Sequence, residues 1–179
     1  HTNTSESVAV FGQLELDITE GARLLLGARY NDDEISIDQT VGFIEGTIPE
    51  APPGSIKAKT DDQAWSWRAI GELDITDDAM VYISVARGYK GPGSNSLTSG
   101  PSSGDVFVDP EIPTNYELGI KSEWWDRRVR LNGAIYYTEF EDFQASTQVP
   151  NAFPPIFFLT NAGELETEGV ELEFNAQLT

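Results

Sequence analysis

The feature that most constrains the fold of this chain is the alternation of apolar and polar side chains with a period of two residues. Residues 128–143 read RVRLNGAIYYTEFEDF, and from Val129 to Tyr137 the odd-numbered residues are apolar or small while most of those between them are polar. Such alternation is typical of a β-strand with one apolar and one polar face. What the apolar face contacts, a protein core or something outside the protein, decides the class of fold.

We predict seven strands, because seven segments of the chain alternate in this way: 8–17, 22–31, 64–74, 79–90, 114–124, 128–143 and 169–179. Short turns such as ITEG and WDRR separate some of them, and long polar stretches such as 32–62 separate the others. The fourth segment is apolar on both faces as far as Ala86, so its orientation stays open at this point. LELDITEGA at 14–22 resembles GELDITDDA at 71–79, which indicates a recurring hairpin unit.

Composition excludes several classes of function. Thirty acidic and eleven basic residues give a net charge of −19, and a surface of that sign disfavours nucleic acid as a partner. The chain has no cysteine, and its single histidine is His1, so thiolate metal sites and histidine-based catalysis have no residues to work with. The acidic pairs of the sequence are typical of solvated turns. We therefore predict that the protein is not an enzyme and needs no cofactor.

Alternation alone does not decide between a soluble β-sandwich and a membrane barrel, because both keep charge off one face. Three features favour the barrel. Turns are short on one side and long on the other, the polar faces are densely charged, and aromatic residues lie at the ends of the apolar faces. These residues are Tyr30, Trp65, Trp67, Tyr116 and Tyr137 beside long loops, and Trp124 beside a short turn.

The segment 170–178 is about 27–30 Å long at roughly 3.3 Å per residue, and strand tilt reduces this to about the height of an outer-membrane apolar band. We predict that the apolar faces contact lipid through Leu24, Leu26, Trp67, Leu118, Ile120, Leu131, Ile135, Leu172 and Phe174. Glu164, Glu166 and Glu168 have the same parity as Val170. Either they lie beyond the hydrocarbon, or a bulge at Gly169 switches the faces.

The chain resembles the β-barrel of TonB-dependent outer-membrane receptors. The strings that carry the resemblance are VFGQLELDIT, LLLGARYNDDE, WSWRAIGELDITDDAMVYISVARGYKGPG, DPEIPTNYELGIKSEWWDRRVRLNGAIYYTEFEDFQ and NAGELETEGVELEF, in that order over residues 8–178. The resemblance implies an all-β fold in which residues 1–179 form a partial antiparallel transmembrane β-barrel, an up-and-down meander with short periplasmic turns and long extracellular loops. A complete barrel of about 22 strands encloses a plug domain, so we expect this chain to be a fragment.

The same resemblance implies active import of ferric siderophore-type chelates across the outer membrane of a Gram-negative bacterium. The expected partners are the lipid bilayer, lipopolysaccharide, a ferric chelate and the TonB complex, which would act through the missing plug domain. One alternative is a passive outer-membrane porin or another barrel transporter. The other is a soluble, acidic β-sandwich that serves as a binding module.

Candidate ligand contacts follow from the side chains near the long loops. Arg87, Tyr89 and Lys90 end the fourth segment, where cations and a phenol could hold an anionic chelate. The alternative is that they brace the wall or face lipopolysaccharide. Phe157, with Phe153 and Phe158, would form an apolar rim or pack its own loop. Three arginines of the polar faces (Arg23, Arg29, Arg68) are predicted to pair with the nearby carboxylates of Glu15, Glu72 and Asp74.

The assignment of faces predicts opposite tolerance to charge at two adjacent positions. Leu118→Arg in the full-length protein should cost about 2–4 kcal/mol of unfolding free energy, because it puts a cation into hydrocarbon. Glu117→Arg should be much milder, since that side chain faces water. A refolding titration in detergent measures both, and equal tolerance at the two positions would contradict the assignment.

Overall fold

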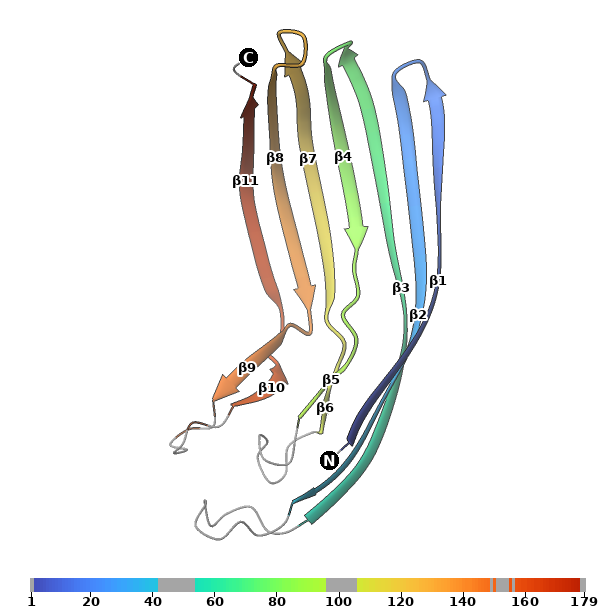
Figure 1. Ribbon diagram of the computed structural model, residues 1–179, viewed down its shortest axis with the longest axis vertical. Helices are drawn as coiled ribbons and strands as arrows, with labels where there is room; N and C mark the ends of the chain where they lie inside the picture. The colour runs from blue at the N-terminus through green and yellow to red at the C-terminus, as the bar shows by residue number, and fades with distance from the viewer. Residues whose placement is uncertain are drawn as a thin grey trace.

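The computed structural model describes residues 2–41, 54–95, 106–148, 150, 155 and 157–177, and their main feature is one curved antiparallel sheet (Figure 1). Its seven strands are β1 (Thr2–Thr19), β2 (Ala22–Val41), β3 (Gly54–Thr76), β4 (Ala79–Arg87), β7 (Ile112–Trp124), β8 (Val129–Glu141) and β11 (Leu165–Ala176). Four short strands lie at the end opposite the tight turns: β5 (Gly93–Ser94), β6 (Phe107–Val108), β9 (Gln144–Gln148) and β10 (Phe157–Asn161).

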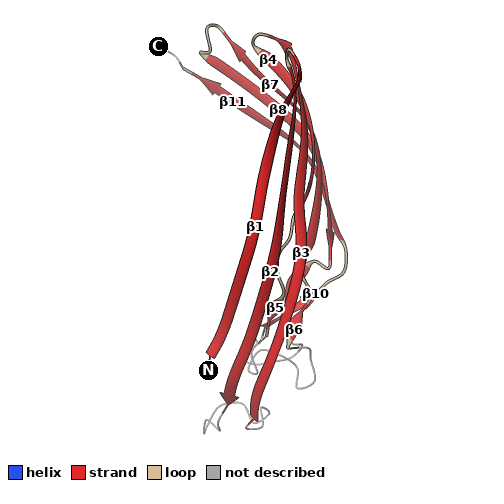
Figure 2. Ribbon diagram, turned by 90° about the vertical axis from the view of Figure 1, so that its right-hand side faces the viewer, coloured by secondary structure: helices blue, strands red, loops and turns tan. Residues whose placement is uncertain are grey.

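The strand order is that of the predicted meander. The sheet runs β1-β2-β3-β4-β7-β8-β11, and every neighbouring pair is antiparallel. Figure 2 shows that it bends like a section of a cylinder wall. No second layer of the described residues covers its apolar face, so the sandwich alternative does not describe this chain. The described residues also include no helix long and apolar enough to cross a membrane.

The first hairpins extend much further than the sequence pattern predicted. Residues 32–41 and 54–62 continue β2 and β3, where we expected a loop, while 42–53 lie outside the described residues. The polarity of the two faces reverses in this extension. Ile35 and Ile37 are odd-numbered, like the polar-face residues earlier in β2. The even-numbered positions, which are apolar earlier in β2, here include Asp38, which forms an ion pair with Lys57 at 2.7 Å. Alternation persists through the reversal, so the strands continue although the apolar face changes sides.

All of the side chains predicted to contact lipid lie on one face of the sheet, as the register of paired strands requires. They are exposed or half-exposed in this chain, up to 79% for Leu172. Polar residues such as Asn31 (6% exposed) and Thr138 are buried on the other face. Contact of the exposed apolar face with lipid stays a prediction.

Pairing with both neighbours settles the orientation of β4. Ile83 lies opposite Gly71 and Leu118, which puts it on the apolar face, and it is 60% exposed there. Tyr82 lies opposite Glu72 and Gly119, on the polar face. The sequence left this orientation open because both faces of the segment are apolar, whereas the register leaves no choice.

Pairing also decides between the two explanations of the glutamates that precede Val170. Glu168 lies opposite Tyr137 and Glu166 opposite Glu139, with no shift of register at Gly169. No bulge therefore switches the faces. The carboxylates keep the parity of the apolar face and lie beyond its apolar part, at the end away from the tight turns.

Aromatic residues pair across strands at the boundary of the apolar face. The rings of Tyr30 and Trp65 are 5.2 Å apart between centroids, and those of Tyr116 and Tyr137 are 6.4 Å apart. Each pair joins directly opposed residues of neighbouring strands. Four of the six predicted aromatic residues therefore pair in space, and such pairs typically add about 0.5–1.5 kcal/mol beyond the burial of their area.

A tyrosine on the polar face covers a glycine of the next strand. Tyr82 lies over Gly119 so closely that a Cβ added to the glycine would be 2.4 Å from the ring. The Tyr82 hydroxyl donates a hydrogen bond of 2.5 Å to Glu117, and the Lys121 ammonium lies 5.1 Å from the ring centroid. Tyr136 covers Gly169 in the same way. Glu117 therefore has a structural partner, so Glu117→Arg costs one hydrogen bond that the pattern alone did not reveal.

Filling the space above Gly119 should destabilise the wall. Gly119→Ala forces the Tyr82 ring to move and should cost about 1–3 kcal/mol of unfolding free energy in the full-length protein. Gly12→Ala is the matched control, because nothing lies within 4 Å of a Cβ at that position. Adding Tyr82→Ala to Gly119→Ala should recover part of the loss. Equal effects of the two glycine substitutions in a urea refolding titration would contradict the close packing.

Candidate functional site

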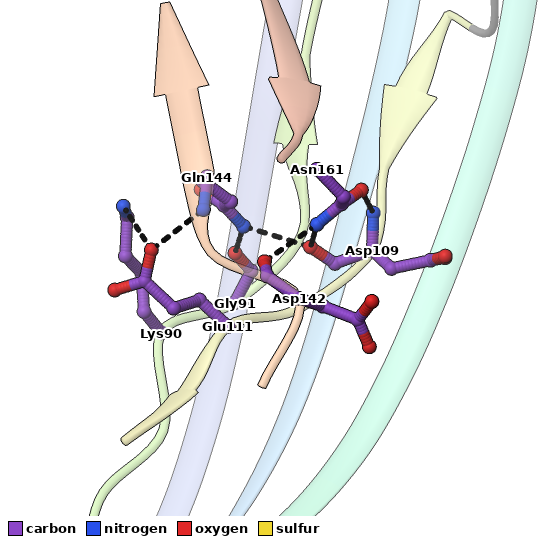
Figure 3. A network of polar contacts seen from close by, with 7 residues as sticks. All are labelled: Lys90, Gly91, Asp109, Glu111, Asp142, Gln144 and Asn161. Carbon is purple, nitrogen blue, oxygen red and sulfur yellow. Dashed lines mark hydrogen bonds and ion pairs between the residues drawn. The ribbon is translucent and has the colours of Figure 1, made fainter. Parts of the chain in front are cut away.

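The end of the sheet opposite the tight turns carries the candidate site. Here β5 pairs with β6 and β9 pairs with β10, so the predicted long loops contain short strands of their own. Some apolar side chains pack here, such as Val108, which is 7% exposed and lies with Leu159 beside Gly93. Polar side chains add further connections between them (Figure 3).

Gln144 is the centre of this network and is only 8% exposed. Its side-chain amide donates hydrogen bonds of 2.9 Å to the carbonyls of both Gly91 and Asp109. Its backbone N–H donates to the Glu111 carboxylate at 2.8 Å (Figure 3). One residue thus connects the segment after β4, the segment after β6 and the start of β7.

Glu111 accepts a second contact from a cation. The Lys90 ammonium lies 3.2 Å from the carboxylate oxygen that Gln144 also uses, and the two residues form a backbone bridge. Glu111 is 6% exposed, whereas about half of the Lys90 side chain faces solvent. The Glu111 carboxylate thus has both a hydrogen bond and an ion pair, and a buried charge needs such partners.

Two asparagines complete the connections. Asn161 donates to the carbonyls of Asp109 (3.0 Å) and Asp142 (2.7 Å) and accepts from the Asp109 N–H (2.8 Å). Asn95 exchanges two hydrogen bonds with the backbone of Leu159, at 2.9 and 2.7 Å. The four short strands and the start of β7 therefore form one connected rim, which we call the polar rim.

A shallow hollow of about 300 Å³ opens where the polar rim meets the beginning of β1. It is lined by Asn3, Ser94, Asn95, Ser146, Phe157, Phe158 and Leu159. Amide and hydroxyl groups here stand beside an aromatic ring that is 55% exposed, that of Phe157. Such a surface can hydrogen-bond the oxygen atoms of a small ligand while the ring packs on its apolar part.

A second hollow, of about 340 Å³, lies over the extended ends of β1, β2 and β3. Its two lysines are already engaged, since Lys57 pairs with Asp38 and Lys59 with Glu34 at 2.6 Å. Among the described residues, no group of three or more acidic or histidine side chains could hold a metal ion. The hollow of the polar rim is therefore the better candidate for a ligand site.

The structure separates the residues that the sequence grouped as ligand contacts. Arg87 lies opposite Trp67, on the apolar face of the sheet, and forms an ion pair with Glu141 at 3.6 Å. That position favours bracing of the wall, the alternative considered above. Lys90 contacts Glu111, and Phe157 lines the hollow together with Phe158 of the predicted apolar rim. Phe153 lies outside the described residues.

Tyr89 lies against the extension of the first hairpins. Burial, followed by the nearby carboxylates of Asp62 and Asp33, raises the pKa of its hydroxyl. That hydroxyl is buried and has no hydrogen bond of ordinary geometry to the part of the chain that the structure describes. The hydroxyl therefore stays protonated and faces the carboxylates of Asp33 and Asp62 on the β2–β3 hairpin.

Nothing in the sequence pattern indicated Gln144, Asn95 or Ser146. Each is an isolated polar residue in a polar stretch, with no motif around it. Their hydrogen bonds join residues far apart in sequence, for example Asn95 and Leu159, and such pairs leave no local periodic pattern.

Comparison with known proteins gives one family model that matches residues 1–179, described as TonB-dependent receptor-like β-barrel. The pesticin receptor of Yersinia pestis is 32% identical over 172 residues, which is 95% of this chain and 23% of that protein. A probable TonB-dependent siderophore receptor of Acinetobacter baumannii is 25% identical over 182 residues, covering 98% of this chain and 22% of its own length.

Among solved structures, the ferric yersiniabactin uptake receptor of Yersinia pestis matches with a TM-score of 0.78 and 28% identity. The match covers 99% of this chain and 25% of that protein. The ferric-catecholate import receptor of E. coli, in its closed form, matches with a TM-score of 0.75 at 21% identity, over 99% of this chain and 26% of its own. That second likeness establishes the fold alone. The chain spans about a quarter of the length of these relatives.

The polar rim should loosen when its central residue is removed. Gln144→Ala leaves the carbonyl of Gly91 without that donor and should lower the local opening free energy by about 1–3 kcal/mol. Amide hydrogen exchange of residues 88–95 and 106–112 in the full-length protein should accelerate accordingly. Gln63→Ala is the control, because its amide makes one exposed hydrogen bond, to Asp32 at 3.3 Å. Unchanged exchange in both segments would contradict the role of Gln144.

Proposed function

The chain belongs to the family of TonB-dependent receptor-like β-barrels, and on that premise we propose that it forms part of the wall of an outer-membrane receptor that imports ferric siderophore-type chelates. The family consists of transport receptors, not enzymes. The observation that carries the proposal is the match of the family model along the whole chain, together with relatives named as siderophore receptors. The identity of the chelate is not part of the proposal.

In this proposal the protein lies in the outer membrane of a Gram-negative bacterium. The face that carries Leu118, Ile135 and Leu172 contacts the hydrocarbon, and the glutamates beyond Val170 lie among lipopolysaccharide head groups. The exposure of this face supports the assignment, because a soluble protein rarely leaves so large an apolar patch uncovered. The TonB complex would supply the energy through a plug domain of the full-length protein.

The ligand would first contact the polar rim. Phe157 and the amides and hydroxyls around it line the hollow there, and Tyr89 and Lys90 belong to the segment that supports it. We leave Arg87 out of the ligand site, because it lies on the other face with Glu141. The rim is connected by hydrogen bonds before any ligand arrives, which lowers the cost of ordering it on binding.

The proposal is tested by transport in cells. The full-length protein, expressed in an iron-starved Gram-negative strain that lacks other ferric-chelate receptors, should restore uptake of radiolabelled iron from ferric siderophores. Uptake should need TonB, because the ligand moves against its gradient. Uptake that persists at the same rate without TonB would favour the passive porin, and no binding or uptake of any ferric chelate would overturn the proposal.

The same system tests the hollow. Phe157→Ala should weaken binding of the transported chelate about tenfold, since an exposed ring that becomes covered by ligand contributes roughly 1.5–3 kcal/mol of burial. Trp125→Ala is the matched control, because that exposed ring lies at a tight turn at the opposite end of the sheet. Equal affinity of the two variants would remove Phe157 from the ligand site.

A further inference from the structure

Four of the eleven basic residues form no ion pair with the described residues, and two of these four, Arg29 and Arg68, lie close together on the polar face. We expected Arg23, Arg29 and Arg68 to pair with carboxylates. Arg23 does so, at 3.1 Å from Glu72 and 3.5 Å from Asp74. Arg29 and Arg68 do not, because no carboxylate oxygen of the described residues lies within 4.0 Å of either guanidinium.

Both arginines contact neutral side-chain amides instead. The Arg29 Nε donates to the Asn31 amide oxygen at 2.6 Å, and an Arg68 Nη donates to that of Gln13 at 2.5 Å. A guanidinium has five N–H donors. Each arginine therefore keeps most of its donors unused by the described part of the chain, while its orientation is already fixed.

The surroundings hold the two side chains in place. The Arg29 guanidinium lies 5.9 Å from the centroid of the Phe11 ring on β1. Arg68 lies directly opposite Gly27, and the absence of a side chain there lets it cross β2 and reach Gln13. Fixed guanidinium groups of this kind lose less conformational freedom on binding than free surface arginines.

The two arginines are diagonal neighbours on the same face. Arg29 is opposite Ser66, and Arg68 is two residues along β3, opposite Gly27. Diagonal neighbours are about 7–8 Å apart between backbones, and both side chains lean over β1, beside Phe11 and Gln13. Two positive charges therefore lie in one band of the polar face.

The overall charge makes this band unusual. The chain has thirty acidic residues, and seven of its eleven basic residues form ion pairs. Carboxylates are thus abundant, yet the positions next to these two arginines are occupied by Gln13, Asn31 and Ser66. Cations whose neighbours are neutral are not neutralised within the described part of the chain, so their charge can bind an anion from elsewhere.

We propose that Arg29 and Arg68 form a binding site for a carboxylate group on the inner wall of the receptor. The planar fork of a guanidinium matches the two oxygens of a carboxylate, which a lysine would not. The carboxylate comes from one of two sources: a ferric chelate that carries it, or an acidic side chain of the part of the protein that this chain lacks. If the carboxylate belongs to a ferric chelate, the inference rests on the proposed function.

The test uses the full-length protein with R29Q/R68Q, which removes both charges but keeps side chains that can donate hydrogen bonds. The matched control is R87Q/R127Q, which removes two arginines that lie elsewhere and pair with Glu141 and Glu123. The first measurement is the melting temperature of the ligand-free protein. The second is the dissociation constant of a carboxylate-bearing ferric chelate, ferric citrate, and of a neutral ferric trihydroxamate.

Two results support the site and distinguish the sources. A melting temperature at least about 2 °C below that of the control indicates an internal carboxylate. About tenfold weaker binding of ferric citrate, with unchanged binding of the neutral trihydroxamate, indicates a chelate carboxylate. If R29Q/R68Q equals the control in both measurements, the site does not exist. If the protein takes up no ferric chelate but the melting temperature still falls, the proposed function fails and the carboxylate site remains.

Discussion

The structure depends on one constraint, the hydrogen-bond ladder that joins seven antiparallel strands. Side chains alternate along each strand, and directly opposed residues share a face, so the face of one residue fixes the face of every residue in its row. Rows such as Leu26–Ala69–Val85–Tyr116 cross most of the sheet without changing sides. The ladder also leaves β1 and β11 each with one edge that no described strand covers. Both edges suit further strands of a larger sheet, because backbone groups need partners wherever water is absent.

The two ends of the sheet are built by different means. At one end the tight turns connect neighbouring strands directly, and Trp125, Asp126 and Arg127 adopt positive φ to close the shortest path between β7 and β8. At the other end the chain leaves the ladder and forms the polar rim. Its segments are connected by hydrogen bonds centred on Gln144 and Asn161, in addition to the packing of Val108 and Leu159. A polar rim of this kind faces water and still keeps a defined shape, which suits a surface that meets a soluble ligand.

Two regions of the polar face differ in how their polar and charged side chains are paired. Tyr82 covers Gly119 and contacts Glu117 and Lys121, so that part of the face is filled and satisfied. Arg29 and Arg68 have only amide partners among the described residues. Both arrangements use a glycine to let a long side chain cross a neighbouring strand. The wall thus contains regions whose polar groups are paired with one another, which stabilises it. In the proposed carboxylate site, the positive charges of Arg29 and Arg68 are available to an anion.

The sequence by itself determined the strands, their alternation and the apolar face, because the period of two and the short turns are local properties of the chain. It also determined the family through strings that follow one another in a fixed order. Only the tertiary structure decided the orientation of β4, whose two faces are equally apolar, and the continuation of strand pairing through 32–41 and 54–62, where the polarity reverses. Only the fold could reveal that Arg29 and Arg68 meet amides while Lys90 meets Glu111. Those partners are brought together by strand register and hydrogen bonds between distant segments, and neither is encoded in any local pattern.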